Sequence, residues 1–323
     1  MKWTSYLLIF AAGIGAGIAV YSRIGSQTEA KDFLEKRSGD YTFINPLLEC
    51  EIAEALLTNP LRPFKNKLEN FLEDLTEKQK LISTASVYFR DLNNGPWIGI
   101  NEKKEFSPAS LLKVPIMMAV LKQSETNPNF LQKKVTLVSD GANANEHFKP
   151  NLPLEKGEVY PVEELMTQMI IGSDNDAKDT LLRTIDIKIL GKIFQEIGVE
   201  EPTINKTDNF ITVKSYASFF RILFNASFLE KAASEKALFI LSQVEFTDGL
   251  KAGIPGNIAI AHKFGERDIN GSKQLHDCGI IYYPSHPYLL CIMTRGSNLE
   301  KMLKAIANIS RFVYQEVDLQ RTK

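Results

Sequence analysis

A lysine stands inside an otherwise apolar run of the sequence, three residues after a serine. The run 106–121 reads FSPASLLKVPIMMAVL, and Lys113 is its only charged residue. Burying an unpaired charge is costly, so this lysine needs a partner or must be neutral. Residues three apart on a helix share one face, which brings the Lys113 ammonium within reach of the Ser110 hydroxyl. Because serine needs a base and a neutral lysine can supply one, the pattern predicts a nucleophile, Ser110, and its proton acceptor or relay, Lys113.

The start of this helix offers another use for Ser110, because serine is a common N-cap residue. Ser107 is the better cap, since Pro108 suits the first helical position. Ser110 is then left free on the first turn, where a helix N-terminus stabilises developing negative charge.

Two further short motifs follow along the chain. Ser173-Asp174-Asn175 comes at the end of an apolar-periodic run, 162–171, and Lys263-Phe264-Gly265 lies inside 258–266, which alternates like a strand. Each tripeptide alone is a weak signal, because Ser-Asp-Asn is most often a loop and a lysine on an edge strand discourages aggregation. Their order and context give them weight.

In this order the three elements resemble the S-x-x-K, S-D-N and K-T-G motifs of penicillin-recognising serine enzymes, closest to class A β-lactamases and their D,D-peptidase relatives. The resemblance covers about Leu61 to the C-terminus. It implies an α+β, β-lactamase/transpeptidase-like fold, in which terminal helices flank a five-stranded antiparallel sheet. An all-helical lobe, about residues 103–250, is inserted, and the site lies between lobe and sheet.

The resemblance also implies roles for the second motif. Ser173 corresponds to the serine that relays a proton to the leaving nitrogen, and Asn175 to the residue that hydrogen-bonds a substrate amide. Asp174 is expected to brace the turn instead.

On the third motif, Lys263 is expected to hold the substrate carboxylate and to keep the site electropositive. Gly265 is expected to let the strand backbone approach the substrate. The backbone N–H groups of Ser110 and Glu266 would form the oxyanion hole.

The chain departs from the family pattern at one place and matches it ambiguously at another. Phe264 replaces the usual threonine or serine and so removes a hydroxyl aimed at the substrate carboxylate; Arg267 is placed to compensate. Glu201 and Asn205 match the E-x-x-x-N spelling of the class A deacylation element, which makes Glu201 a catalytic candidate. The span around them is short for that loop, so an ordinary connecting loop is the alternative.

Composition excludes other partners. The 323 residues carry 38 basic and 39 acidic side chains and a net charge of −1, which gives no electrostatic case for a nucleic acid. The four histidines show no ligand spacing, so no metal and no cofactor is expected.

The N-terminus predicts a membrane location. Residues 3–22 carry no formal charge, just enough to cross a bilayer, so 1–22 is expected to be an uncleaved membrane anchor or else a cleaved signal peptide. Residues 23–60 are expected to form a linker and N-terminal extension, and 61–323 the catalytic domain. The hydrolase resemblance places the domain on the extracytoplasmic face, or outside the cell if the segment is cleaved.

The cysteines predict neither a metal site nor a disulfide framework. Cys278 and Cys291 fall on two strands of one expected hairpin, which turns at 284–287. Mirror pairing about that turn offsets them by about 7 Å, too far for a bridge, so free buried thiols are expected.

Apolar periodicity predicts the remaining elements. Helical spacing marks 64–81, 111–123, 162–171, 177–185, 187–197, 213–223, 234–244 and 299–317. Strand patterns mark 84–92, 97–101, 258–267, 275–283 and 288–295. Residues 139–160 are polar and read as a long surface loop.

The leading functional hypothesis is an extracytoplasmic serine acyl-transfer hydrolase that forms an acyl-enzyme at Ser110 with β-lactams or related amides. The alternatives are a D-Ala-D-Ala carboxypeptidase that acts on peptidoglycan and a non-catalytic homologue that binds cell-wall peptide. Retention of Ser110, Lys113 and Ser173 argues against the non-catalytic alternative, since binding alone does not need them. A Ser-His-Asp hydrolase is disfavoured, because no G-x-S-x-G elbow occurs in the chain.

Overall fold

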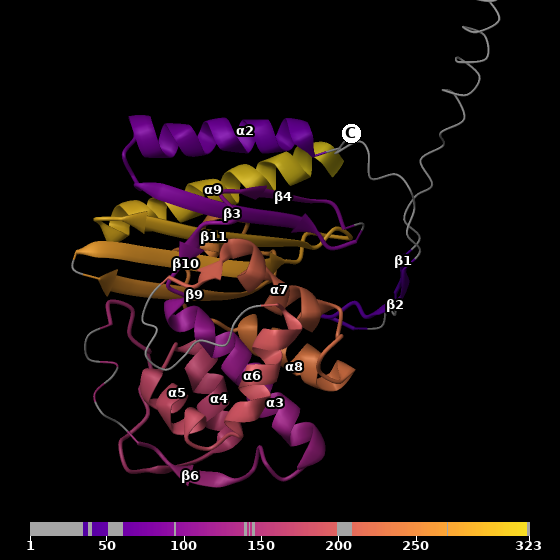
Figure 1. Ribbon diagram of the computed structural model, residues 1–323, viewed down its shortest axis with the longest axis vertical. Helices are drawn as coiled ribbons and strands as arrows, with labels where there is room; N and C mark the ends of the chain where they lie inside the picture. Colours follow the sequence, from indigo (N-terminus) through magenta and orange to yellow (C-terminus); the bar gives the residue numbers. More distant parts are fainter. Residues whose placement is uncertain are drawn as a thin grey trace, which may run out of the picture.

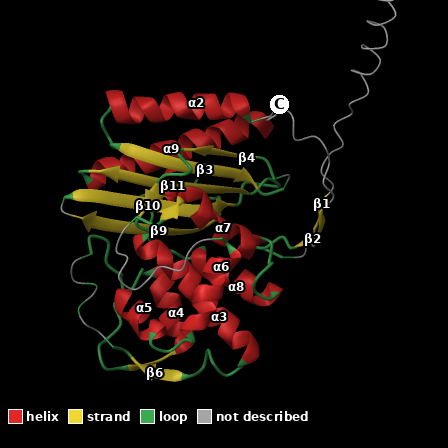
Figure 2. Ribbon diagram, viewed as in Figure 1, coloured by secondary structure: helices red, strands yellow, loops and turns green. Residues whose placement is uncertain are grey.

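A five-stranded antiparallel sheet separates two terminal helices from a block of helices (Figures 1 and 2). The computed structural model describes residues 35–37, 41–50, 61–93, 95–138, 141, 143, 146–198, 209–269 and 271–321. Across the sheet the strands are β4 (Trp97–Ile100), β3 (Thr84–Asp91), β11 (Tyr288–Gly296), β10 (Ser272–Ile281) and β9 (Ile260–Ile269). The sheet expected from the sequence is therefore present, and β9 is one of its edges.

The two terminal helices lie side by side on one face of the sheet (Figure 1). They are α2 (Arg62–Glu73), extended by the turn η1 (Asp74–Lys78), and α9 (Leu299–Arg321). The rings of Phe71 and Phe312 stack with centroids 4.7 Å apart, and Lys67 Nζ lies 2.8 Å from a Glu316 carboxylate oxygen. This contact joins the beginning and the end of the domain.

The helical block packs against the other face of the sheet, around one buried helix. That helix is α3 (Lys113–Thr126), of which every residue from 113 to 121 is buried, because it is apolar on all sides apart from its lysine. The other helices of the block are α4 (Val162–Ile171), α5 (Asn175–Leu182), α6 (Ile187–Glu196), α7 (Val213–Phe224) and α8 (Lys231–Leu241). Helix α7 contacts β3 and β11 and so joins the block to the sheet.

Several short elements complete the described part of the chain. They are β1 (Glu35–Arg37) with β2 (Leu47–Cys50), β5 (Glu105–Phe106) with β8 (Ile211–Thr212), β6 (Lys134–Thr136) with β7 (Val159–Pro161), and the turns η2 (Ala109–Leu112) and η3 (Leu250–Gly253). Their two- to four-residue lengths are too short for a hydrophobic period, so the sequence patterns did not indicate them.

The segment before α2 is bound to the domain where it is described. The backbone N–H groups of residues 42, 43 and 44 donate to the carboxylate of Glu235 on α8. The Phe43 ring packs edge-on against Phe239 of α8 and Tyr282 of the β10–β11 loop. Residues 41–46 thus touch both the helical block and the sheet.

The expected membrane segment, 1–22, lies outside the described residues, as does most of the expected linker. Within the part of the chain that the structure describes, no helix has both the length and the apolarity needed to cross a bilayer.

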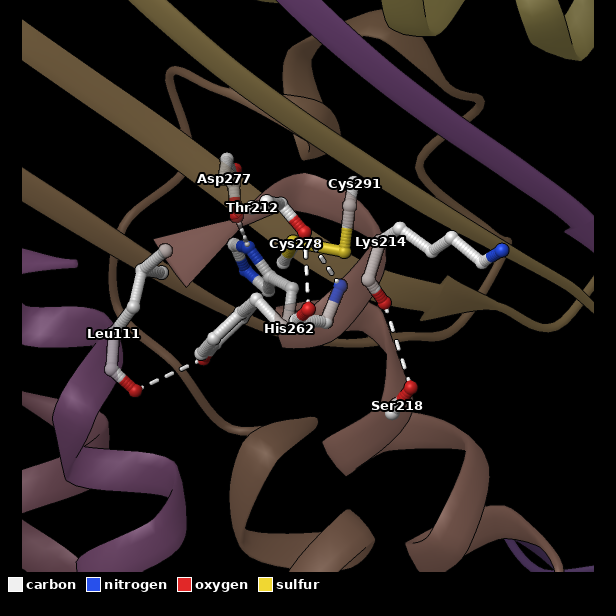
Figure 3. The surroundings of a disulfide bond; sticks show 10 residues. Leu111, Thr212, Lys214, Ser218, His262, Asp277, Cys278 and Cys291 are labelled. Carbon is white, nitrogen blue, oxygen red and sulfur yellow. Dashed lines mark hydrogen bonds and ion pairs between the residues drawn. A yellow bond between two sulfur atoms is a disulfide. The ribbon is translucent and has the colours of Figure 1, made fainter. Parts of the chain in front are cut away.

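The prediction of free thiols at 278 and 291 is wrong, because the two cysteines form a disulfide (Figure 3). Ile281 pairs with Tyr288, so the hairpin loop is 282–287 and its centre falls between Pro284 and Ser285. The expected pairing has its centre one residue later, and moving the centre by one residue shifts every partner by two. Cys278 therefore faces Cys291 directly, with Cα atoms 4.0 Å apart.

Candidate active site

Ser110 lies in a tight turn immediately before the buried helix. The turn is the 3-10 segment η2, and α3 begins at Lys113. Ala109, the residue before the serine, has φ +50°. A left-handed conformation costs a non-glycine residue about 1–2 kcal/mol, so the surroundings must hold this backbone in place.

The expected helix cap at Ser107 is not observed, because the helix begins six residues later and no side chain caps η2. The Ser107 backbone is instead bound to β10: its N–H donates to Gln274 Oε1 at 3.1 Å, and its carbonyl accepts from His276 Nε2 at 2.9 Å. Burial lowers the pKa of His276 to about 4, so its ring is a neutral donor at this carbonyl. Strand β10 therefore holds in place the backbone that leads into Ser110.

Lys113 joins the serine of the turn to the second motif. Its Nζ is 2.9 Å from Ser110 Oγ and 3.0 Å from Ser173 Oγ, and it also donates to the Ser173 carbonyl. Burial, reinforced by the charge of Lys178, lowers the pKa of the Lys113 ammonium to about 7. A substantial neutral fraction is therefore available near neutral pH, as a general base requires.

Ser173 lies between two lysines. Its hydroxyl accepts from Lys113 Nζ and, at 2.9 Å, from Lys263 Nζ. The residue has φ +57°, and the following Asp174 caps α5 by accepting from the Ala177 N–H at 2.8 Å. The expectation that Asp174 braces this turn is confirmed.

Lys263 is fully buried under the site and does not reach the surface. Its Nζ donates to Ser173 Oγ and to the Phe264 carbonyl, and it lies 4.0 Å from the centre of the Phe264 ring. Burial, with the charge of Lys113, lowers the pKa of Lys263 well below its ordinary value. The side chain thus contributes to the proton network around Ser173.

Gly265 allows β9 to lie directly against the serine turn. A Cβ at this position would be 2.9 Å from the Pro108 carbonyl oxygen and 3.0 Å from the Leu111 nitrogen. Any side chain would therefore push the strand away from the backbone that carries Ser110. The expected approach of this strand is to a substrate, whereas the observed approach is to the protein's own turn.

Some of the predicted residues line a cleft of about 930 Å³ between the helical block and the β9–β10 hairpin. They are Ser110, Lys113, Asn175, Glu266 and Arg267. It is also lined by ionisable residues that the sequence patterns do not mark, namely Glu146, His147, Lys178, Asp268 and Lys273. No motif marks these residues; the only signal was the polar character of 139–160, which contains the first two.

Glu266 ties a loop of the helical block to the sheet. Its Oε1 accepts from the backbone N–H groups of His147 and Phe148, each at 2.8 Å. Burial raises the pKa of the Glu266 carboxyl, and Glu146 adds to the rise. Residues 147 and 148 of the loop 137–158, which connects β6 and β7, are thereby held against β9.

Phe264 strengthens the same attachment. Its ring stacks on Phe246 with centroids 4.1 Å apart, and Phe148 meets both rings edge-on. The side chain is buried rather than turned toward a substrate. The departure from the hydroxyl of the family pattern therefore serves packing of the loop.

The predicted deacylation element is not placed by the structure. Glu201 and its partner Asn205 lie outside the described residues, so the deacylation assignment stays a prediction. In the described ranges, no group of three or more His, Cys, Asp or Glu side chains gathers as a metal site would require.

Comparisons with known proteins agree with the fold and the family expected from the sequence. A model of the β-lactamase enzyme family matches residues 64–317. A mutant of PBP-A, solved as an acyl-enzyme complex with penicillin-G, is 26% identical, with a TM-score of 0.65 over 78% of this chain and 97% of that one. A class A β-lactamase from Mycobacterium abscessus is 19% identical, with a TM-score of 0.66 over 78% of this chain and 99% of that one. The TLA-3 extended-spectrum β-lactamase is 18% identical, with a TM-score of 0.68 over 78% and 99% of the two chains.

A comparison with curated proteins gave no match. The family match covers most of the chain, and the chain belongs to the β-lactamase enzyme family. It has the β-lactamase/transpeptidase-like fold and is an enzyme of the serine-hydrolase class. The fold and family expected from the three motifs are thus confirmed.

Proposed function

We propose that this enzyme forms an acyl-enzyme at Ser110 with β-lactams or related amides. The observation that carries the proposal is the 2.9 Å contact between Ser110 Oγ and Lys113 Nζ, in which burial lowers the pKa of the lysine to about 7. A neutral lysine at hydrogen-bonding distance is the base that a serine nucleophile needs.

Acylation begins with proton transfer from Ser110 Oγ to neutral Lys113 as the oxygen attacks the amide carbonyl carbon. The negative charge on the carbonyl oxygen is stabilised by the backbone N–H groups of Ser110 and Glu266, which border the junction of turn and strand. Loss of one such donor typically costs about 3 kcal/mol of transition-state stabilisation.

Ser173 completes the step by passing a proton to the leaving nitrogen. Its hydroxyl is 3.0 Å from Lys113 Nζ and 2.9 Å from Lys263 Nζ, so it can give up its proton and regain one from Lys113. When the C–N bond breaks, the acyl group remains on Ser110 and the nitrogen becomes an amine, which stays attached to the adduct if the substrate is a β-lactam and departs if it is a linear amide.

Recognition divides between two sides of the cleft. Asn175 binds the amide carbonyl of the acyl group, and Arg267 and Lys273, which line the cleft, bind the substrate carboxylate. Lys263 does not bind the carboxylate directly in this proposal, because its buried Nζ donates to Ser173 Oγ and to the Phe264 carbonyl.

A peptidase acting on D-Ala-D-Ala peptides is the second candidate. Phe264 favours it over a β-lactamase, since the hydroxyl that the family pattern aims at the substrate carboxylate is absent. Hydrolytic release of the acyl group needs a base for water, for which Glu201 remains the proposed residue.

We also place the domain outside the cytoplasm, tethered by residues 1–22 or secreted if they are removed. The uncharged run 3–22 supports this location. The disulfide between Cys278 and Cys291 supports it independently, because disulfides form and persist in oxidising compartments.

Intact-protein mass spectrometry after incubation with a penicillin tests the proposal. The wild type should gain the mass of one penicillin, Ser110→Ala should gain none, and Ser173→Ala should gain it more slowly. If Glu201 activates water, Glu201→Ala should retain an adduct that the wild type loses. Full labelling of the Ser110→Ala protein would discard the assignment.

The same instrument tests the location. Protein from cells is alkylated under denaturing conditions before digestion, and peptides carrying positions 278 and 291 should be linked and unalkylated. Alkylation at both positions in freshly harvested cells would count against an oxidising compartment.

A further inference from the structure

A segment from the N-terminal side of the chain docks on the domain as the tip of a hairpin. Strand β1 pairs with β2, from Glu35 opposite Cys50 to Arg37 opposite Leu47. Residues 41–46, the strap, lie between these strands and contact the domain. Because the two strands are paired, the chain arrives at the strap and leaves it at one place.

The strap is held through its main chain. The N–H groups of residues 42, 43 and 44 donate to the Glu235 carboxylate at 2.9–3.0 Å, and the Asn45 N–H donates to the Phe224 carbonyl at 2.8 Å. The Phe43 carbonyl accepts from the Tyr282 hydroxyl at 3.0 Å. Four successive N–H groups therefore have partners in the domain, which a linker passing over a surface does not require.

The side chains on both sides of this contact fit it. Ile44 is only 3% exposed, and the Phe43 ring lies 6.0 Å from the Phe239 ring. Glu235 and Phe239 are four residues apart on α8 and so share one face of that helix. The neighbouring Lys236 pairs with Glu163 of α4, so the strap N–H groups are the partners that Glu235 has. Hydrogen bonds to a charged carboxylate are about twice as strong as neutral ones.

The strap lies at the opposite end of the sheet from the cleft. Strand β10 begins at Ser272, in the hairpin that walls the cleft, and ends at Ile281, next to the Tyr282 that holds the strap. Its ten residues span about 30 Å at about 3.3 Å each. Figure 1 shows the β9–β10 turn at one end of the sheet and β1 with β2 beyond the other.

We propose that the strap orients the domain, so that in the membrane-tethered protein the cleft faces away from the bilayer. The inference rests on the proposed tether, residues 1–22. With the strap docked, only residues 23–34 separate the tether from the domain, and a flexible chain of that length has an r.m.s. span of about 20 Å. Without docking, residues 23–61 would separate them, with a span of about 35 Å. The first span is shorter than the sheet and the second is not, so docking keeps the strap end toward the membrane and presents the cleft to substrates beyond it.

Energy transfer from the domain to the bilayer tests the orientation. Full-length protein is reconstituted in phosphatidylcholine vesicles that contain a headgroup-labelled acceptor lipid. One fluorophore is placed at Ser285→Cys, near the strap, or at Ser272→Cys, near the cleft; both positions are exposed. Cys50→Ser is included so that the introduced thiol is the only free one, because Cys278 and Cys291 are bonded to each other. Transfer should be larger from position 285 than from position 272.

Glu235→Ala should release the strap. Amide exchange in residues 42–44 should accelerate by about tenfold or more, and the difference in energy transfer between the two positions should disappear. Acylation by benzylpenicillin should be retained, since α7 also joins the helical block to the sheet, and it shows that the variant is folded. Glu230→Ala removes the same charge from an exposed position beside α8 and should match the wild type. Phe43→Ala releases the strap in a second way and leaves α8 unchanged.

The outcomes separate this proposal from those it rests on. Amides 42–44 that exchange in the wild type as fast as in an unfolded chain, equal transfer from the two positions, or a difference that survives release of the strap would each overturn the orientation. Full-length protein that does not associate with vesicles overturns the tether, and the orientation falls with it. Acylation at Ser110 is measured separately and stands or falls alone.

Discussion

At the scale of single residues, the site is built by burying two lysines around one serine hydroxyl. Lys113 and Lys263 are both fully buried, and both contact Ser173 Oγ. The charge of Lys113 makes Lys263 harder to protonate, which adds to the effect of burial on the pKa of Lys263. Such an arrangement trades stability for reactivity, because an ammonium that is free in water becomes partly neutral in the folded state.

Lys113→Met should reveal that trade as a pH-dependent stability difference. The lysine titrates at about 7 in the folded state and at 10.5 when unfolded, so between these values the unfolded chain binds more protons. Wild-type stability therefore rises with pH across this window, by at most about 1.4 kcal/mol per unit from this group. The variant lacks that slope, and its stability relative to wild type should be greatest at or below pH 7.

Urea unfolding of both proteins at about pH 7, 8 and 9 measures the effect. The unfolding free energy of the wild type should increase relative to that of Lys113→Met as the pH rises. A difference that stays constant across these three values would mean that Lys113 is not held with a lowered pKa.

The sequence predicts residues of this site that belong to compact motifs and misses those that reach it from a loop. Ser110 and Lys113 can be predicted because a single lysine in an apolar helix is costly to bury unless it has a partner or is neutral. Glu146 and Lys273 lie on a polar loop and near a hairpin turn, where a charge is ordinary. Their proximity to Ser110 depends on long-range packing that one-dimensional spacing does not contain.

At the scale of elements, the close contact between β9 and the serine turn determines the site. Gly265 should be intolerant of substitution, since a Cβ would strike backbone atoms of that turn rather than flexible side chains. Gly265→Ala should reduce the acylation rate by about 100-fold, because a misplacement of about 1 Å has that effect on reacting groups. Overpacking of about 1–3 kcal/mol should also lower the Tm by a few degrees.

Gly256→Ala is the matched control, because a Cβ there meets nothing within 4 Å. Acylation rates and thermal melts of the two variants should differ clearly, with Gly256→Ala like the wild type. If Gly265→Ala keeps a wild-type acylation rate, the strand does not constrain the turn as described.

Element types follow from the sequence better than registers do. The apolar period predicts helices at 162–171 and 213–223, and the structure has α4 at Val162–Ile171 and α7 at Val213–Phe224. The pairing of β10 with β11 depended on one residue in the centre of a loop, and that error hid the disulfide. Apolar patterns indicate the periodicity and the buried face of an element, whereas the register between two strands depends on the geometry of the turn that joins them.

At the scale of the whole molecule, catalysis requires both parts to meet. The helical block supplies the serine, Lys113 and the second motif, and the sheet supplies Lys263, Gly265 and Glu266. The loop 137–158 joins the two through Glu266, and residues 41–46 join them again at Glu235 and Tyr282. The three motifs predicted this meeting only through their resemblance to a known family, since spacing gives no distance between lobes.

The pH dependence of acylation tests most directly whether neutral Lys113 is the base for Ser110. Below its pKa of about 7, the neutral fraction of the lysine falls about tenfold with each pH unit. The second-order rate of acylation by benzylpenicillin, measured from about pH 5 to pH 9, should therefore rise with that slope and level off above about 7. A rate that is flat across this range, or that falls as the pH rises, would contradict the account.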